Sequence, residues 1–426
     1  MKIAVASSGL GHVARGIETW ARDTACALAQ AGVDVTLFCA GQVNASARTV
    51  VLPSLRRGDA AAGRAAVYSP GWAWRWQLKS DYGWEQLSFW RHLWPHLRRG
   101  KFDILHVQDP MLAYWCRAFR KWGWVETKEI LAHGTEESAE FLHKFDYVQH
   151  LAPWHEQQVA ASREQGAGSK EEGGGATIRP HAPCSLLKPY WAAIPNFVDT
   201  EVFRPASSLG ERAAARAAFG LPPGAFVVGA VAAVKRHHKR VDYLIGEFAR
   251  YLASEAAAVP SERSPMLVIA GARTTETDEL IELARQAAPE RIRVFCDLPR
   301  ERMPDFYRAL DVCVLPSLFE MMPIAVLEAL ASGVPVLANR HPVLQWMIGA
   351  DDETAGGDGE SGGCGIDMAA PGALARCLRT VSPEWTRQRG AQARRRAESV
   401  FSRPVVVSQY IAYYRRILEE RTEGSA

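Results

Sequence analysis

Short apolar runs alternate with longer amphipathic segments along most of the chain. Near the start, residues 3–6 form an apolar run that is typical of a buried strand. Residues 16–31 follow with apolar side chains at helical spacing, and this pattern ends at Gly32. A further apolar run at residues 33–39 predicts a second strand. Strand, helix and strand in this order indicate a parallel sheet with helices on its faces.

The alternation continues toward residue 338 with one interruption. In the first half, strands are predicted at residues 104–107 and 130–132. Glycines and prolines interrupt the pattern at residues 166–185, which predicts a mobile surface loop. A second mobile loop is expected at residues 351–365, where Gly, Asp and Glu dominate. The second half predicts strands at 226–234, 266–270, 292–296, 312–315 and 335–338, and helices at 241–253, 277–288, 301–310, 323–331 and 405–418.

Two such series predict two α/β domains, which also suits a length of 426 residues. We expect two doubly wound, Rossmann-like domains that face each other across a cleft. The first is expected at residues 1–193 and the second at 194–404, with a C-terminal helix at 405–426 packing back on the first. In sheets of this kind, ligands bind beyond the carboxyl ends of the strands. Candidate chemistry is therefore expected in the loops that follow strands.

The composition is that of an ordinary globular protein. Fifty basic and 47 acidic residues give a net charge of +3, and 48% of the residues are hydrophobic. These values exclude a disordered chain and a strongly basic nucleic-acid binder. The longest apolar stretch, 321–338, is interrupted by Glu328, Gly333 and prolines, so no membrane span is expected. The start of the chain has the pattern of a strand, and eight scattered cysteines without a Cys-x-x-Cys pair favour reduced thiols in a cytoplasmic protein.

The strongest group of candidate functional residues follows the strand predicted at 312–315. Glu320 lies in the loop, Pro323 suits the first turn of the next helix, and Glu328 lies within that helix. The free N–H groups of a helix start favour an anionic ligand. A carboxylate accepts hydrogen bonds from vicinal hydroxyls. The pattern suggests a sugar or ribose beside a phosphate, and two solvated glutamates on an amphipathic helix are the alternative.

A basic run at residues 235–240, Lys-Arg-His-His-Lys-Arg, lies where a predicted strand leads into a helix. Cations at this position meet phosphate groups in open α/β sheets. They also stabilise the negative charge that builds up on a departing diphosphate. A solvated basic loop or a nucleic-acid patch is the alternative, although basic runs without interleaved aromatic residues are weak evidence for nucleic acid.

Three smaller features belong to the first half of the chain. His133 and Asp109 each follow a predicted strand. Taken alone, a histidine at a strand end is more often structural, and Asp109 is equally suited to capping a loop. A glycine-rich turn at residues 9–16 follows the first strand and ends with Arg15 and Gly16. Glycines in such a turn let the backbone approach a ligand closely.

Residues 71–97 contain six tryptophans, at positions 72, 74, 76, 84, 90 and 94. Three interpretations stay open for this segment. It forms a packed amphipathic helix at 85–97 with a loop before it, or it forms an aromatic acceptor platform that includes Trp84. In the third interpretation it anchors the protein at a membrane surface, where nearby basic residues meet anionic lipids.

Glu320 and Glu328 stand eight positions apart within SLFEMMPIAVLEALASGVPVLA. This segment resembles the Glu-x7-Glu motif of retaining glycosyltransferases of family 4. Four further segments resemble the family's Gly-Gly-x-Glu segment, its Asp-x-x-His strand, its Pro-Asn-Gly-Val-Asp linker and the stretch before the motif: ARGIETWARDTACALAQAGVDVTLF, FDILHVQDP, AIPNFVDTEVFRP and MPDFYRALDVCVLPSLFE. The resemblance covers most of the chain and implies the GT-B fold, with the activated sugar bound mainly to the second domain and the acceptor to the first.

The resemblance also implies roles for single residues near the transferred sugar. Glu328 holds the ribose hydroxyls, and Glu320 lies beside the sugar. The backbone of Met321, Met322 and Ile324 touches the sugar and the diphosphate. The family usually has Glu-Gly-Phe-Gly where this chain has Glu-Met-Met-Pro. The departure leaves the identity of the donor sugar open.

On the phosphate side, Lys239 takes the place of the lysine that grips the diphosphate. The companion arginine of the family falls near Ala230 and is missing, so Lys235 or Arg236 is expected to replace it. His133 matches the family's active-site histidine, which contacts the donor sugar or the acceptor. The nucleotide and its phosphates are therefore expected to meet Gly16, Arg15, Lys235, Arg236, Lys239, Leu298 and Glu328.

Together these features predict a hexosyltransferase-type enzyme that retains the anomeric configuration of its donor. The donor is expected to be a UDP- or GDP-sugar, and the acceptor a hydroxyl of a glycan, glycolipid or small metabolite, with Asp109 and Trp84 as candidate acceptor contacts. His133, Glu320 and Lys239 are the expected catalytic residues. Because no Asp-x-Asp pair and no metal-type cluster of His and Cys occurs, we expect no metal and no cofactor, the nucleotide sugar being a substrate.

Two alternatives remain at this point. One is a phosphorylase on the same fold that uses orthophosphate, and the other is a non-catalytic module that binds sugar nucleotides. No nucleic-acid partner is expected. The location is expected to be cytoplasmic, and peripheral contact with the inner face of the membrane is a further possibility that the tryptophan segment raises.

Overall fold

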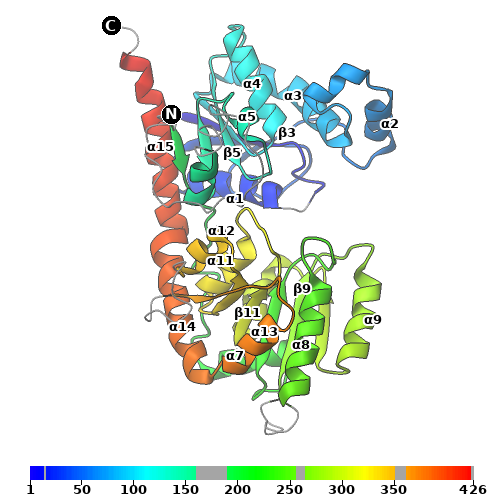
Figure 1. The fold of residues 1–426 in the computed structure, drawn as a ribbon. Helices are drawn as coiled ribbons and strands as arrows, with labels where there is room; N and C mark the ends of the chain where they lie inside the picture. The colour runs from blue at the N-terminus through cyan, green and yellow to red at the C-terminus, as the bar shows by residue number, and fades with distance from the viewer. Residues whose placement is uncertain (14–15, 160–189, 256–263, 351–360, 424–426) are drawn as a thin grey trace, which may run out of the picture. The chain divides into compact units, whose positions relative to one another are not determined.

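The computed structural model describes residues 1–13, 16–159, 190–255, 264–350 and 361–423. The chain divides into two compact units, one formed by Met1–Asn196 with Val406–Ala426 and the other by Phe197–Val405 (Figure 1). The loop expected at 166–185 lies outside the described residues. Each unit is built around one parallel sheet, so the expected class of two Rossmann-like α/β units is confirmed.

The described strands of the first unit form a seven-stranded sheet in the order β3-β2-β1-β4-β5-β6-β7. All neighbouring strands run parallel. The order along the sheet reverses between β1 and β4, and such a switch point is where open α/β sheets bind ligands. The strands are β1 Lys2–Ser7, β2 Asp34–Cys39, β3 Arg48–Val51, β4 Ile104–Val107, β5 Lys128–His133, β6 Val148–His150 and β7 Trp191–Ala193.

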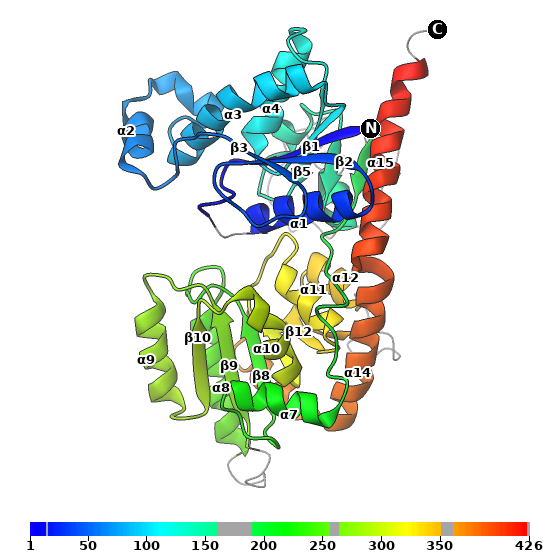
Figure 2. The same cartoon turned by 180° about the vertical axis from the view of Figure 1, so that it is seen from behind.

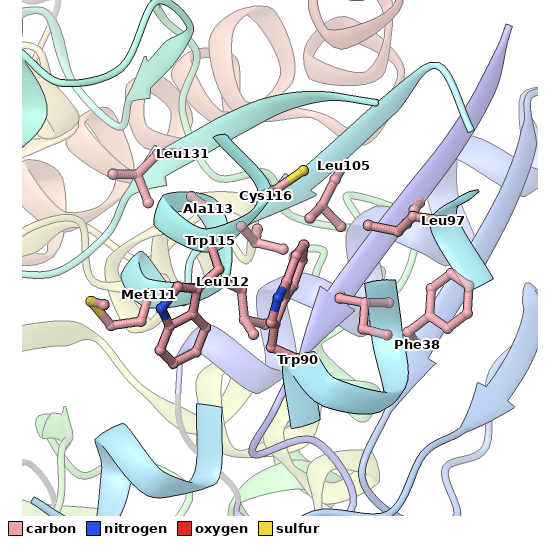
Figure 3. Packing of buried hydrophobic residues seen from close by; sticks show 14 of the residues in the cluster. Phe38, Trp90, Leu97, Leu105, Met111, Leu112, Ala113, Trp115, Cys116 and Leu131 are labelled. Carbon is pink, nitrogen blue, oxygen red and sulfur yellow. The ribbon is translucent and has the colours of Figure 1, made fainter. Parts of the chain in front are cut away.

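Helices cover this sheet, and their apolar faces form its core. Phe38 of β2 and Trp90 of the long helix α3 belong to one buried cluster, together with side chains of β4 and α4 (Figure 3). The helical segments are α1 Gly16–Gln30, α2 Ala60–Tyr68, the 3-10 helix η1 Gly71–Trp76, α3 Asp81–Gly100, α4 Pro110–Lys121, α5 Ala139–Leu142 and α15 Arg403–Glu423.

From Val406 onward α15 belongs to the first unit and is joined to its sheet by buried hydrogen bonds. Tyr414 OH lies 2.7 Å from Nδ1 of His106, and Nε2 of the same ring lies 2.8 Å from Oε1 of Gln149. Tyr410 OH accepts hydrogen bonds from Trp20 and Gln149. Aromatic residues with polar ends therefore fix this helix against β4 and β6. In the described part of the chain, no helix combines the length and the apolar run that crossing a membrane requires.

The described strands of the second unit form a six-stranded parallel sheet in the order β10-β9-β8-β11-β12-β13. Its switch point lies between β8 and β11, which pair in parallel. The strands are β8 Val227–Val231, β9 Met266–Gly271, β10 Ile292–Cys296, β11 Val312–Leu315, β12 Val336–Asn339 and β13 Gly363–Ile366.

Helices lie on both faces of this second sheet. Side chains of α8, α9 and α13 pack with the strands in one buried cluster, and Figure 2 shows α7 and α10 on the opposite face. The helical segments are α7 Leu209–Ala218, α8 Val241–Glu255, α9 Thr277–Ala287, η4 Arg300–Arg302, α10 Met303–Ala309, α11 Ile324–Ala331, α12 Pro342–Ile348, α13 Ala373–Thr380, α14 Pro383–Arg396 and the π-helical turn η5 Ala397–Phe401.

One sequence prediction about local structure is wrong. The loop expected at 351–365 is not a loop throughout, because residues 363–366 form β13 and pair with β12. Its short sequence Gly-Cys-Gly-Ile carries no run of β-branched side chains, and pairing with a buried neighbour decides the conformation instead. The pattern also missed β3, β6 and β7, which have only three or four residues each.

Candidate active site

Two loops of the second unit meet at the switch point of its sheet. Lys239 lies in the loop that follows β8, and Glu320 lies in the loop that follows β11. Lys239 Nζ donates to Glu320 Oε1 and forms an ion pair with it. The Lys239 side chain keeps 21% of its accessible surface and the Glu320 side chain 10%, so the ammonium group is the more exposed partner of the pair. The structure thus brings together two of the three expected catalytic residues.

The basic turn before α8 is fastened to its surroundings by backbone contacts. His238 and Arg240 both have positive φ angles, 68° and 50°. His238 Nε2 donates to the carbonyl of Phe319 at 3.0 Å, and Arg240 donates to the carbonyl of Met368 at 2.9 Å. These bonds hold the turn against the loop that carries Glu320. The left-handed conformation of two non-glycine residues is maintained by the turn's surroundings, as is common at functional sites.

Lys235 and Arg236, the two candidates to replace the family's companion arginine, differ in their contacts. Arg236 Nη1 lies 2.9 Å from Glu279 and 3.6 Å from Glu276, and these ion pairs turn the guanidinium toward α9. Lys235 forms no ion pair with any residue of the described segments. Of the two side chains, Lys235 therefore has the cation that remains available for a phosphate.

Glu328 lies on α11 and is 9% exposed. Its Oε2 accepts a hydrogen bond from the hydroxyl of buried Tyr307 at 3.0 Å. Tyr307 comes from α10 and was not identified from the sequence, although it stands in the segment MPDFYRALDV that carries part of the resemblance. Burial and the negative charge of Glu328 both raise the pKa of Tyr307, so the hydroxyl stays protonated and donates.

Helix α11 begins at Ile324, one residue later than expected, with Pro323 at its N-cap position and no side chain capping it. Met321 and Ile324 are partly exposed beside this open helix start, whereas Met322 is buried. Leu298 is partly exposed two residues beyond the end of β10. The residues expected near a nucleotide thus lie on loops and helix starts at the carboxyl edge of this sheet.

His133 ends β5 in the first unit and is buried. Its Nδ1 lies 3.1 Å from Nδ1 of His150, and its ring also packs against His155. Burial lowers the pKa of His133 to about 4, against the opposing effect of a hydrogen bond to the Thr135 backbone. Burial lowers the pKa of His150 as well. His133 is therefore neutral near pH 7 and offers hydrogen bonds rather than a positive charge.

Asp109 occupies the N-cap position of α4 at the switch point of the first sheet, but its side chain does not cap the helix. Asp109 Oδ1 lies 2.7 Å from Ser8 Oγ and 3.1 Å from Tyr82 OH. Oδ2 has no hydrogen-bond partner among the described residues. Burial raises the pKa of Asp109 to about 6, although the hydrogen bond from Ser8 acts in the opposite direction. Complete burial places this carboxyl beneath the surface of the unit.

A buried ion cluster beside Asp109 was not identified from the sequence. Arg57 donates from Nε to Glu85 Oε1 at 3.0 Å, and its Nη2 lies 3.1 Å from Glu18 Oε1. His12 Nε2 lies 2.8 Å from Glu85 Oε2. The partners stand 28 to 73 positions apart in the chain, so no local motif reveals them.

The glycine-rich turn after β1 passes close to this cluster. A Cβ at Gly9 would lie 2.3 Å from Glu18 Oε1 and 2.4 Å from Arg57 Nη2. A Cβ at Gly16, the first residue of α1, would meet nothing within 4 Å. A hollow of about 400 Å³ beside the turn is lined by Gly11, His12 and Glu18, among others. Arg15 lies outside the described residues.

The tryptophan segment divides into a buried and an exposed part. Trp90 is buried in the core, and the Trp84 indole N–H lies 3.0 Å from Ser69 Oγ and 3.0 Å from the Leu78 carbonyl. The packed helix expected at 85–97 is thus present within α3. Trp72, Trp74 and Trp76 are exposed on η1. Trp84 has a structural role that fastens η1 to α3.

The expected site residues fall into one group in each unit. The second unit contains Glu320, Lys239, Lys235, Arg236, Leu298, Glu328, Met321, Met322 and Ile324. The first unit contains His133, Asp109, Gly16 and Trp84. Across the described segments, no three His, Cys, Asp or Glu side chains are arranged to hold a metal ion.

Two family models match this chain. The model for "Glycosyltransferase Family 4" matches residues 14–163, and the model for "Glycosyl transferases group 1" matches residues 225–379. The first match contains His133 and Asp109, and the second contains Lys239, Glu320 and Glu328. Each model therefore covers one of the two groups of expected site residues.

Curated relatives carry a consistent name. The chain is 31% identical to a D-inositol 3-phosphate glycosyltransferase of Kineococcus radiotolerans over 236 residues, which are 54% of this chain and 52% of the relative. It is 37% identical to an enzyme of the same name from Nocardiopsis dassonvillei over 155 residues, 35% of this chain and 34% of the relative. The chain thus spans about half the length of the first relative and a third of the second.

Solved structures match the fold over nearly the whole chain. Sucrose-phosphate synthase from Thermosynechococcus elongatus has a TM-score of 0.71 at 19% identity and covers 98% of this chain and 99% of its own. Anabaena Alr3699/HepE in complex with UDP-glucose has a TM-score of 0.65 at 13% identity, with 99% and 100% covered. At these identities the likeness shows the fold, and the expected GT-B class is confirmed. The chain belongs to the group 1 glycosyltransferases of family 4.

Proposed function

We propose that this protein is a retaining glycosyltransferase that moves a sugar from a UDP- or GDP-sugar to a hydroxyl acceptor. The observation that carries the proposal is the pair of Lys239 and Glu320 at the switch point of the second sheet. A sugar diphosphate offers a partner to each: phosphate oxygens to the ammonium group and hydroxyls to the carboxylate. Donor binding is expected to replace the direct ion pair by these two contacts.

The nucleotide part of the donor is assigned to the same unit. Glu328 presents a carboxylate whose orientation Tyr307 restricts, which suits two hydrogen bonds from vicinal ribose hydroxyls. The uncapped start of α11 leaves backbone N–H groups for a diphosphate. Solved structures of the same fold contain UDP, UDP-glucose or ADP, which supports a nucleoside diphosphate donor, and Leu298 is proposed to lie near the base.

In the proposed reaction, the bond between the anomeric carbon and the β-phosphate oxygen breaks, and its electron pair stays on that oxygen. The acceptor hydroxyl oxygen bonds to the anomeric carbon on the same face, and its proton passes to the leaving phosphate. Lys239 and Lys235 stabilise the negative charge that develops on the diphosphate. The configuration at the anomeric carbon is retained because attack and departure share one face.

The acceptor is assigned to the first unit. The curated relatives are named D-inositol 3-phosphate glycosyltransferases, which supports a small polyol metabolite as the acceptor class. His133 is neutral at physiological pH because burial lowers its pKa to about 4. We therefore propose that it contacts sugar or acceptor hydroxyls through uncharged hydrogen bonds.

The test measures thermal stabilisation of the full chain by UDP, GDP, ADP and orthophosphate. A ligand at about 100 times its Kd adds roughly 2.7 kcal/mol to the free energy of unfolding. We expect stabilisation by one nucleoside diphosphate, and its loss in Glu328→Ala and Lys239→Ala. Arg236→Ala is the matched control, because its guanidinium is already paired with Glu279.

Turnover completes the test. Incubation with the selected nucleotide sugar and myo-inositol phosphate or other polyols, followed by NMR of the anomeric proton, reports both activity and configuration. Stabilisation by orthophosphate alone, with phosphate-dependent cleavage of a disaccharide, would replace the transferase by a phosphorylase. Nucleotide binding without transfer to any hydroxyl acceptor would favour a non-catalytic module.

A further inference from the structure

Large exposed apolar side chains are concentrated on one part of the first unit. Among the described residues, twelve large hydrophobic side chains are exposed, and five of them lie within ten consecutive positions: Val67, Tyr68, Trp72, Trp74 and Trp76. Tyr68 is 81% exposed and Trp74 is 65% exposed. The second unit exposes only scattered examples among its described residues, Val202, Leu209 and Leu318. We call the five clustered residues the aromatic patch.

The aromatic patch is held by a buried base. Between its tryptophans, Ala73 is buried, and Leu78 is buried directly after them. The Trp84 indole N–H contacts both Ser69 and Leu78, which fastens both ends of η1 to α3. A Cβ at Gly83 would lie 2.0 Å from the carbonyl oxygen of Gln77, so α3 packs directly against this turn. The exposed rings are therefore presented by an ordered segment.

Helix α2 extends the same surface. Its exposed positions are Ala60, Ala61, Arg64, Val67 and Tyr68, which recur at helical spacing along one face. The solvent-facing side of a helix in a globular protein normally carries charged and polar residues. Here that face is apolar except for one arginine. Figures 1 and 2 both show α2 at the outer edge of the first unit, beyond α3.

The charges around the aromatic patch have one predominant sign. Four exposed cations lie in the stretch of the chain that carries the patch, residues 56–79, namely Arg56, Arg64, Arg75 and Lys79, against one exposed carboxylate, Asp59. None of these four cations forms an ion pair within the described segments. Arg75 lies over the Trp74 ring, 5.7 Å from its centroid. The surface therefore combines exposed indole rings with uncompensated positive charge.

We propose that the aromatic patch docks this protein onto an anionic lipid bilayer surface. Tryptophan and tyrosine rings reside favourably at the depth of lipid headgroups, where their apolar bodies and polar edges are both accommodated. Cations beside them add attraction to anionic lipids, and stable surface binding needs two such contributions together. A sugar platform instead places carboxylates and amides beside its rings. Here the exposed charged neighbours are four cations and one carboxylate, Asp59, and the exposed uncharged polar neighbours are Gln77 and Ser80. The proposal does not depend on the transferase reaction.

The test is sedimentation of the full chain with vesicles. One set contains phosphatidylcholine alone, and the other contains phosphatidylcholine with 30% phosphatidylglycerol, about the anionic content that gives a marked surface potential. We expect binding to the anionic set, much weaker binding to the neutral set, and release at high salt, since screening shortens the range of the attraction.

Two variants separate the two contributions. One variant removes the three indole rings (Trp72→Ala/Trp74→Ala/Trp76→Ala) and is expected to weaken binding to anionic vesicles at least tenfold. The other removes three cations (Arg64→Ser/Arg75→Ser/Lys79→Ser) and is expected to weaken the same binding by about 10- to 100-fold. Trp122→Ala is the matched control: this tryptophan is 63% exposed on the same unit, but its ring packs against Phe119 and Trp124. It is expected to bind as the parent does.

Several outcomes would overturn the proposal. They are equal binding to both vesicle sets, no binding to either, undiminished binding of the tryptophan variant, or an equal loss in the Trp122 control. Binding of soluble oligosaccharides that disappears in the tryptophan variant, without vesicle binding, would assign the patch to a sugar. Nucleotide-induced stabilisation of each variant is measured in parallel, since it reports folding and the donor site independently of lipid.

Discussion

Tyr307 donates a hydrogen bond to Oε2 of Glu328 at 3.0 Å, and its hydroxyl also lies 3.1 Å from the carbonyl oxygen of Ala325. The tyrosine is fully buried between Phe203 and Phe306. A buried carboxylate keeps its orientation only where its hydrogen-bond partners are fixed. Tyr307 is thus a positioning residue for the carboxylate that the proposed function assigns to the ribose.

Tyr307→Phe is expected to weaken nucleoside diphosphate binding about 5- to 10-fold, because the carboxylate of Glu328 loses the hydrogen bond that orients it, and this is about 1–1.4 kcal/mol. The ring and its packing remain, so the thermal midpoint without nucleotide is expected to change little. Calorimetric titration with the nucleotide that stabilises the parent protein measures the effect. Unchanged affinity in Tyr307→Phe, beside a clear loss in Glu328→Ala, would show that the tyrosine does not orient the carboxylate.

The cations near the switch point of the second sheet are expected to differ sharply in importance. Lys239→Ala is expected to lower kcat/KM by about 10²- to 10³-fold, because a fixed cation on the leaving group acts mainly in the transition state. Lys235→Ala is expected to have a smaller effect, mainly on donor KM. Arg236→Ala is expected to be nearly neutral, because that guanidinium pairs with Glu279 on α9. Initial rates at varied donor concentration measure all three.

If Arg236→Ala lowered kcat/KM as much as Lys235→Ala or more, Arg236 would be the residue that replaces the family's companion arginine. Lys239→Arg serves as a second control, since it keeps the charge but not the compact ammonium group. Because the Lys239 pair is partly exposed, none of these changes is expected to move the unfolding midpoint strongly.

The sequence pattern predicted much of this second site because its information is local. Glu320, Glu328 and the basic turn each follow a strand, and a parallel sheet brings the ends of its strands to one edge. Even the start of α11 was displaced by only one residue. Contacts that join distant segments could not be predicted in this way. No local pattern around Tyr307 indicates that it contacts Glu328. The cluster of Arg57, Glu85 and Glu18 forms only when three separate loops and helices pack together.

Asp109 gives the first unit a pH dependence of its own. Burial raises its pKa from 3.8 to about 6, so the folded state holds a proton that the unfolded state releases between these values. The favourable contribution of the protonated Asp109 carboxyl to the free energy of unfolding is fully present below pH 3.8. It is lost as the pH rises through 6. Asp109→Asn keeps an acceptor for Ser8 and Tyr82 without the charge. The variant is expected to be more stable at pH 7.5 by up to about 3 kcal/mol.

Hydrogen exchange of the β4 amides reports the opening free energy of this unit without assuming that both units unfold together. The difference between Asp109→Asn and the parent is expected to shrink from pH 7 to pH 4. A variant that is less stable than the parent at pH 7.5 would mean that the ionised carboxyl contributes favourably where it stands.

His106 is expected to stay neutral through mildly acidic pH. Gln149 Nε2 donates to the Ile194 carbonyl, so its Oε1 faces His106 Nε2 and accepts a hydrogen bond from it. His106 Nδ1 then accepts from Tyr414. Burial lowers the pKa of His106 to about 3, against a usual value of 6.5. Below pH 6.5 the His106 ring binds a proton in the unfolded chain but stays neutral in the folded chain. The contribution of neutral His106 to the free energy of unfolding is therefore present above pH 6.5 and is lost as the pH falls toward 3.

Long-range ¹H–¹⁵N spectra of the imidazole rings distinguish the tautomers of His106 directly. We expect the Nε2–H form at pH 7.5 and at pH 5. The opening free energy of β4 is expected to fall by up to about 2 kcal/mol per buried histidine between pH 6.5 and 5. An imidazolium signal from His106 at pH 6 in folded protein would contradict the assignment.

Gly9 and Gly16 stand in the same turn but are expected to respond oppositely to alanine. At Gly9 the new methyl group would meet Glu18 Oε1 at 2.3 Å and Arg57 Nη2 at 2.4 Å, and both atoms are already held in the buried ion cluster. Gly9→Ala is therefore expected to destabilise the first unit by about 1–3 kcal/mol. At Gly16 the methyl group meets no atom within 4 Å, so Gly16→Ala is expected to be neutral or stabilising by up to about 1 kcal/mol.

The pair also separates folding from ligand binding at this turn. Gly16→Ala leaves the free unit intact, so any loss of nucleotide affinity in that variant reports the close approach of a diphosphate to its backbone. Exchange of the β1 and β4 amides measures the stability of both variants, and calorimetric titration measures their affinity for nucleotide. If Gly9→Ala were as stable as the parent, the cluster of Arg57, Glu18 and Glu85 would have to relax without cost, and the dense packing of this turn would not constrain the first unit.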